Sequence, residues 1–118
     1  QMLYYFDNSI VMELSKSIIL LSCLAHESRL LIFKQLVQAG SSGSTPKQLV
    51  EKLNMPAATP SFHLKELYQA GLTHKEKRGR SINYYADYNC MSSLIHYLQE
   101  NCCAADHCDS CQESVGLR

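Results

Sequence analysis

Four cysteines lie within ten residues near the end of the chain, at Cys102, Cys103, Cys108 and Cys111. Thiolates bind soft metal and metalloid ions, and paired thiols also form disulfides. The chain does not start with a basic segment followed by an apolar run, so we expect no secretory signal and a reducing, cytoplasmic location. In that compartment such a cluster is more typical of a metal-binding or redox-active site than of a disulfide knot.

A second group of reactive side chains is basic. The segment from His74 to Arg80 carries four lysines or arginines and one glutamate. The formal net charge of the chain is zero, but residues 46–80 carry seven basic and three acidic side chains, a balance of +4. Residues 81–118 carry one basic and five acidic side chains, a balance of −4. A basic middle of this kind binds polyanions even in a neutral protein.

A chain of 118 residues is long enough for one domain and a tail. We expect a domain over residues 1–101 and a cysteine-rich tail over 102–118. No apolar stretch reaches the roughly 18 residues that a membrane span requires, so we expect no membrane partner.

Apolar periodicity predicts helices over residues 9–25 and 26–39. The expected apolar row of the first helix is Ile10, Leu14, Ile18, Leu21 and Ala25.

Two short helices follow. Thr45, Pro46 and Gln48 form a capping-box pattern that begins a helix over residues 46–53. A further helix over residues 57–70 must keep Pro60 in its first turn, because proline lacks the amide donor. Two short helices joined by a tight turn are typical of a helix-turn-helix.

Strands are predicted over residues 72–77 and 82–86, with Arg78-Gly79-Arg80 at the turn, and a last helix over 89–101. A helix-turn-helix followed by a basic hairpin is a winged helix, mainly α with one small hairpin. Its second helix enters the major groove and its hairpin reaches phosphates. The residues expected to contact DNA are Thr59, Ser61, Phe62, His63, Lys65, Lys77, Arg78 and Arg80.

The basic hairpin and His63 each have an alternative interpretation that does not involve DNA. The basic hairpin is also consistent with a solvated turn. His63 is also consistent with a packing or hydrogen-bonding residue on the buried face of its helix, since one face of that helix must be core.

The segment from Ala57 to Leu67, followed by Ala70-Gly71-Leu72, resembles the recognition-helix signature of the ArsR/SmtB family of winged-helix repressors. Residues 24–30 resemble that family's entry into its second helix, and Gly79 to Tyr84 its wing. The similarity covers residues 12 to 103, with Pro60 departing from the usual aliphatic residue. It implies a homodimer built from the first and last helices, bound to a palindromic double-stranded operator and released by a toxic metal or metalloid.

The resemblance also implies where a sensor site would lie. Familiar arsenic-sensing members carry a Cys-x-Cys motif at the start of the third helix, but residues 46–50 contain no cysteine. Zinc and cobalt sensors use Asp-x-His and His-x-x-His on the last helix. The comparable positions here are Asp87-x-Asn89 and Glu100-x-x-Cys103, which do not favour a nitrogen and oxygen zinc site.

The tail resembles the arsenical-sensing branch with a C-terminal cysteine site. Trivalent arsenic or antimony binds three thiolates, so we expect Cys102, Cys103 and Cys108 as ligands of an inducer, with no constitutive cofactor. Cys111 is a substitute or fourth thiol. Adjacent residues project about 100° apart on an ideal helix. Cys102 and Cys103 therefore converge on one ion only where the helix frays or ends.

Alternatives remain for the thiols. The tail is also consistent with unused exposed thiols, a redox switch through Cys102–Cys103 or Cys108–Cys111, or a four-thiolate zinc or soft-metal site. Cys23 and Cys90 are expected in the core, although Cys23 would alternatively approach the partner's tail. A thiol oxidoreductase using Cys108 and Cys111 lacks the preceding strand of known redox folds, so we expect no enzyme.

Overall fold

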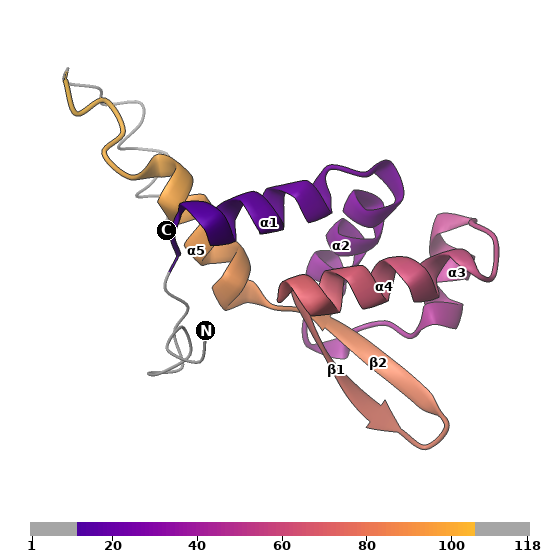
Figure 1. Ribbon diagram of the computed structural model, residues 1–118. Coiled ribbons are helices and arrows are strands. Elements are labelled where there is room, and N and C mark those ends of the chain that lie inside the picture. The colour runs from indigo at the N-terminus through magenta and orange to yellow at the C-terminus, as the bar shows by residue number, and fades with distance from the viewer. Residues whose placement is uncertain (1–11, 106–118) are drawn as a thin grey trace.

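The computed structural model describes residues 12–105. Figure 1 shows α1 running alongside α4, with α5 beside the start of α1 at one end and the hairpin projecting from the body. The winged helix-turn-helix architecture, mainly α with one hairpin, is confirmed. In chain order the elements are α1 (Leu14–Leu24), α2 (Glu27–Ala39), the 3₁₀ turn η2 (Gly40–Ser42), α3 (Pro46–Leu53), α4 (Thr59–Ala70), β1 (Thr73–Arg78), β2 (Ser81–Ala86) and α5 (Tyr88–Gln99).

Helix α3 begins and ends where its local sequence predicts. The Thr45 hydroxyl accepts from the Gln48 amide at 3.2 Å, and the Thr45 amide donates to Gln48 Oε1 at 2.9 Å. Pro46 occupies the first helical position, where no amide donor is required. Asn54 adopts a left-handed conformation, φ 52°, and ends the helix. This capping box satisfies two amides that the helix itself leaves unpaired.

Helix α4 begins at Thr59, two residues later than predicted. The delay arises because the Thr59 amide donates to the Pro56 carbonyl at 3.0 Å, which folds the intervening residues into a turn. Pro60 lies in the first turn, as expected. Gly71, at φ 94°, ends the helix, and Lys16 donates to the terminal Ala70 carbonyl at 3.1 Å.

The core lies between α1, α2, α3 and α4, and it continues into the hairpin and α5. Each fully buried leucine or isoleucine in it contributes roughly 1.5–3 kcal/mol. The residues without exposed surface include Leu20, Ile32, Leu36, Leu49, Leu64, Leu67, Leu72, Ala86 and Cys90.

The apolar row predicted for the first helix does not face this core. Met12 and Glu13 precede the helix, and residues 9–11 lie outside the described part. Leu14 is 64% exposed and Ile18 is 53% exposed, whereas the buried side of α1 carries Ser17, Leu20 and Cys23. Helix α5 is also apolar on an exposed side, which carries Ile95 and Leu98. None of the helices within residues 12–105 is long and apolar enough to cross a membrane.

Both strands reach one residue further toward the tip than predicted, and β1 begins at Thr73, one residue later than predicted. Arg78 pairs with Ser81, so Gly79 and Arg80 form the turn, with Gly79 at φ 62°. A third segment joins the sheet at Ser44. Its amide donates to the Tyr84 carbonyl at 2.9 Å, and the Tyr84 amide donates back to Ser44 at 2.8 Å. This bridge anchors the base of the wing to the loop that precedes α3.

The close approach of this loop to β2 depends on Gly43. A Cβ atom there would lie 2.6 Å from both Asn83 Nδ2 and the Tyr84 carbonyl oxygen. Gly40 has a similar backbone, φ 62° against 65° for Gly43, but open space around it. A comparison of substitutions at Gly40 and Gly43 therefore separates the energetic cost of a positive φ from the cost of a steric clash.

We predict that Gly43→Ala lowers the free energy of unfolding more than Gly40→Ala does, by about 1–3 kcal/mol, because only the first substitution overpacks the loop against β2. Both substitutions carry the backbone strain of a positive φ, roughly 1–3 kcal/mol. Urea denaturation of the two variants measures the difference. Equal losses would show that the bridge tolerates displacement of the loop.

Candidate nucleic-acid interface

Helix α4 presents one buried and one exposed face. Leu64 and Leu67 have no exposed surface, and they place the helix against the core. Thr59 is half-buried at the helix start. The face turned to solvent carries Ser61, Phe62, Lys65, Tyr68 and Gln69. Three of the predicted contact residues, Ser61, Phe62 and Lys65, thus lie together on the exposed face of the helix that follows the turn.

His63 lies on the other face and is only 8% exposed. Its Nδ1 atom accepts a hydrogen bond from Arg29 Nε at 3.2 Å, and its ring lies 4.6 Å from the ring of His26. Burial lowers the pKa of His63, with smaller contributions from His26 and Arg29 opposed by Glu66. The burial of His63 therefore does not favour the expected contact with bases. Its contacts match the alternative of a packing and hydrogen-bonding residue.

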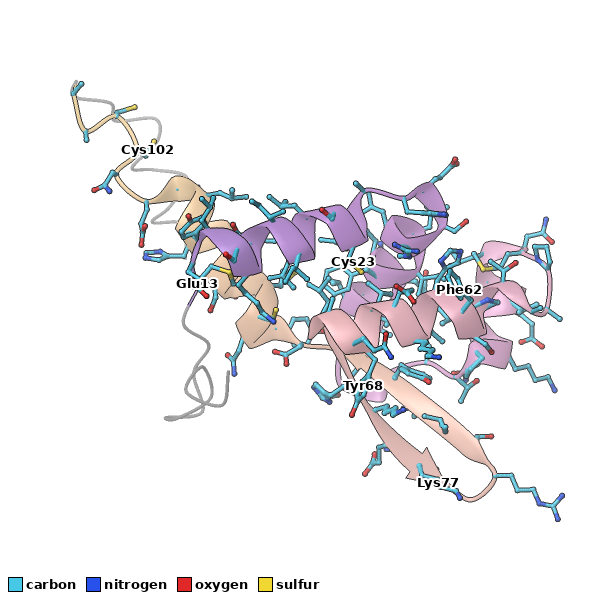
Figure 2. The ribbon with its side chains drawn as sticks, in the orientation of Figure 1. Glu13, Cys23, Phe62, Tyr68, Lys77 and Cys102 are labelled. Atoms are coloured by element: carbon cyan, nitrogen blue, oxygen red, sulfur yellow. The ribbon has the colours of Figure 1, made fainter. Side chains whose placement is uncertain are left out.

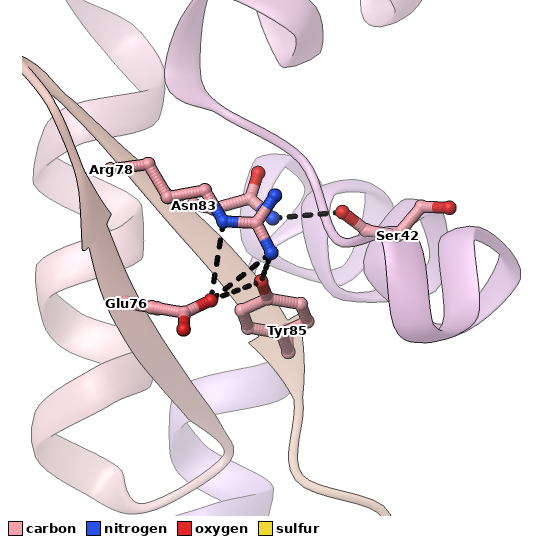
Figure 3. A network of polar contacts seen from close by, with 5 residues as sticks. All are labelled: Ser42, Glu76, Arg78, Asn83 and Tyr85. Atoms are coloured by element: carbon pink, nitrogen blue, oxygen red, sulfur yellow. Dashed lines mark hydrogen bonds and ion pairs between the residues drawn. The ribbon is translucent and has the colours of Figure 1, made fainter.

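The wing carries exposed Lys75, Lys77, Arg78 and Arg80. Figure 3 shows Arg78 folded back across the hairpin, where Nη2 donates to Glu76 at 3.1 Å and to the Tyr85 hydroxyl at 3.0 Å. The Tyr85 hydroxyl donates to the same Glu76 oxygen at 2.9 Å. These hydrogen bonds, with the charge of Arg78, lower the pKa of Glu76. The structure thus gives Arg78 an internal partner that the sequence analysis did not identify.

A contact between aromatic and cationic groups joins the wing to α4. The Lys75 ammonium lies 4.3 Å from the centre of the Tyr68 ring, in the geometry of a cation–π interaction. Figure 2 places Tyr68 at the base of the hairpin, Lys77 near its tip and Phe62 further along α4 toward α3. The exposed face of α4 and the basic hairpin therefore form one continuous surface.

The predicted sensor cysteines are described only in part. Helix α5 ends at Gln99, two residues earlier than predicted, and Asn101 and Cys103 take left-handed conformations, φ 59° and 56°. The exposed thiols of Cys102 and Cys103 lie 3.7 Å apart. The helix end that these two residues need in order to converge is therefore present.

The other predictions for the tail concern residues outside the described part of the chain. Cys108 and Cys111 belong to residues 106–118, so the three-thiolate set stays a prediction, as does the domain boundary at residue 101. No group of three or more histidine, cysteine, aspartate or glutamate side chains suited to a metal occurs among residues 12–105.

The other candidate ligands have structural roles. Asp87 accepts from the Cys90 amide at 3.0 Å and caps α5. Cys23 and Cys90 are buried, as expected for core residues. Burial raises the pKa of the Cys90 thiol to about 11 and also raises the pKa of Cys23. Both thiols therefore stay protonated near neutral pH, and inert.

Comparisons with known proteins agree with this geometry. Residues 24–76 match a family model described as a helix-turn-helix domain. An ArsR-like transcriptional regulator from Rhodococcus sp. RHA1 superposes with a TM-score of 0.67 at 20% identity, covering 86% of this chain and 93% of that one. HlyU from Vibrio cholerae N16961 is similar at 26% identity and a TM-score of 0.58, covering 71% of this chain and 91% of that one.

A third similar structure is a transcriptional regulator, HlyU from Vibrio vulnificus CMCP6. It is 26% identical, with a TM-score of 0.53 and coverage of 71% of this chain and 88% of that one. A comparison with curated proteins found no match. The chain thus contains a helix-turn-helix domain and has the winged-helix fold of these regulators.

The hydrogen bond between Arg29 and His63 predicts that the stability of the protein depends on pH. Arg29 donates to the neutral imidazole, so protonation of His63 removes the acceptor and adds a second cation. Because the pKa of His63 is lower in the folded state, the unfolded state binds the proton more tightly. The stability that neutral His63 contributes is therefore complete above about pH 6.5, and it is lost as the pH falls below that value. His63→Gln keeps an acceptor that does not titrate. We expect thermal melts of the variant to lose less stability on acidification than those of the wild type, and parallel losses would contradict the role of His63.

The cations of the wing predict how strongly DNA affinity depends on salt concentration. Each phosphate contact removed lowers the slope of log K against log salt concentration by about 0.9. Arg78→Ala combined with Arg80→Ala should flatten that slope by up to about 2 on any duplex, whereas Lys34→Ala, an exposed cation on α2, should leave it unchanged. Fluorescence anisotropy at several salt concentrations measures the slope. An unchanged slope in the double variant would remove the wing from the interface.

Proposed function

We propose that this chain is a DNA-binding transcriptional repressor of the ArsR/SmtB family, acting in the cytoplasm and without catalytic activity. The observation that carries the proposal is the continuous surface formed by the exposed face of α4 and the basic hairpin. Helix α4 has the position of a recognition helix, and the hairpin has the charge that phosphate contact requires. The helix-turn-helix match over residues 24–76 and the fold of the ArsR-like regulator support this assignment.

The proposal includes a homodimer that uses α1 and α5. Several large apolar side chains on these two helices are about half exposed, whereas Leu20 of α1 and Leu94 of α5 are buried in the core. A two-fold axis near this surface repeats the recognition helix and matches a palindromic operator. The side chains that a partner would cover are Leu14, Ile18, Ile95 and Leu98.

The proposed inducer is trivalent arsenic or antimony bound to Cys102, Cys103 and Cys108. Two observations support this: the exposed thiols of Cys102 and Cys103 lie 3.7 Å apart, and Cys102 comes three residues after the end of α5. Cys108 lies close enough in sequence to supply the third thiolate. An ion that draws the three thiolates together would act on the end of α5, and α5 belongs to the proposed dimer surface. A tenfold loss of operator affinity requires a coupling of about 1.4 kcal/mol.

A second candidate is a redox switch at the same residues. The contact between the Cys102 and Cys103 thiols favours it, because an oxidant would act on neighbouring exposed thiols first. The two candidates differ in what releases the operator: arsenite under reducing conditions, or an oxidant without arsenic.

We predict that arsenite releases the reduced wild-type protein from a bound operator, and that replacing Cys102, Cys103 and Cys108 with serine abolishes release while preserving DNA affinity. Cys111→Ser is the matched comparison, and it should still be released by arsenite, because Cys111 is only a substitute or fourth thiol for the proposed set. Operator binding is measured by anisotropy with a non-thiol reductant present. Release of the triple variant by arsenite would show that the sensor lies elsewhere, and release by peroxide alone would favour the redox switch.

A further inference from the structure

Phe62 is an exposed aromatic residue on a face of α4 that is polar apart from Phe62 itself and Tyr68. Its side chain is 56% exposed, and the exposed neighbours Ser61, Lys65 and Gln69 are polar. It lies on α4, whereas the half-exposed apolar side chains of the proposed dimer surface lie on α1 and α5. Figure 2 shows it on the half of α4 nearer α3, away from the wing tip. A dimer through α1 and α5 therefore does not account for its exposure.

The ring of Phe62 is in contact with two neighbouring side chains, His63 and Arg29. The Phe62 and His63 rings pack edge to face, with centroids 5.3 Å apart and planes at 68°, and the Arg29 guanidinium lies 5.8 Å from the centre of the Phe62 ring. Arg29 is itself held, since it donates to His63 at 3.2 Å and to the Cys23 carbonyl at 3.4 Å. This support places the ring before any partner arrives, which lowers the entropy that binding costs.

The chemistry around Phe62 indicates what it contacts. Hydroxyl, amide and ammonium groups on the same face suit phosphates and the polar edges of bases, but a phenyl ring forms no hydrogen bond with either. The one apolar group that a base pair presents in the major groove is the 5-methyl group of thymine. A phenyl ring on a helix in that groove is complementary to it.

We propose that Phe62 is a specificity-determining residue that contacts the 5-methyl group of a thymine in the operator. The proposal rests on the DNA-binding function proposed above. Arg29 and His63 are positioning residues for this contact, because both lie against the ring and His63 is on the buried face of α4.

The test uses the full chain and duplexes that it selects from a random library. In the selected duplex each thymine is replaced in turn by deoxyuridine, which removes the methyl group and keeps the base pair. We expect one thymine in each half-site at which this replacement weakens wild-type binding about three- to fivefold, the effect of burying roughly one methyl group. With Phe62→Ala the same replacement should have no effect.

Two further variants serve as controls. Phe62→Leu keeps an apolar side chain and should retain part of the preference for thymine over deoxyuridine. Tyr68→Ala removes another exposed aromatic from α4, the one that contacts Lys75, and should weaken binding without changing that preference. Circular dichroism melts check that all variants fold.

The outcomes separate this inference from the proposed function. A wild-type protein insensitive to every deoxyuridine, or a Phe62→Ala variant with unchanged sensitivity, overturns the role of Phe62 while DNA binding stands. Selection that enriches no sequence also overturns it, since no base is then read. A Phe62→Ala variant that changes oligomeric state but not DNA affinity assigns the ring to a protein contact instead. A chain that binds no duplex removes both proposals.

Discussion

The burial of Leu64 and Leu67 is the constraint on which the candidate interface depends. Both side chains lack exposed surface, and their spacing fixes the rotation of α4 about its axis. That rotation turns Ser61, Phe62 and Lys65 outward and His63 inward, toward Arg29. Local sequence does not determine whether a histidine on α4 faces the core or the solvent. The packing of the core determines it, because any other rotation of α4 would expose two leucines.

The wing depends on the body in a similar way. Its base is tied to the loop before α3 by the Ser44–Tyr84 bridge and by Asn83, which donates to the Ser42 carbonyl at 2.8 Å (Figure 3). Tyr68 and Lys75 add a contact to α4. A displacement of α4 would therefore move the wing as well. In the repressor that we propose, this rigidity lets an event at the end of α5 act on both DNA-contacting elements together.

The sequence alone predicted most of the elements, because their signals are local. The capping box at Thr45 and Gln48 determined α3 to the residue, and Gly71 ended α4 as expected. The start of α4 was placed two residues early because the turn formed by the Thr59 amide competes with helix geometry and leaves no sequence pattern. Arg29, Glu76 and Tyr85 were missed because each acts through a partner distant in sequence or across the hairpin.

What the sequence by itself determined is the order and type of the elements, the position of the basic hairpin and the cysteine cluster, since spacing and residue type are sufficient for these. Only the tertiary structure decided which apolar rows are core. Leu14 and Ile18 have the same helical spacing as buried residues, yet they remain exposed on α1. Periodicity reports that a helix has an apolar face. Whether that face meets the same chain or remains available to another depends on where the helix packs, and that is a property of the whole fold.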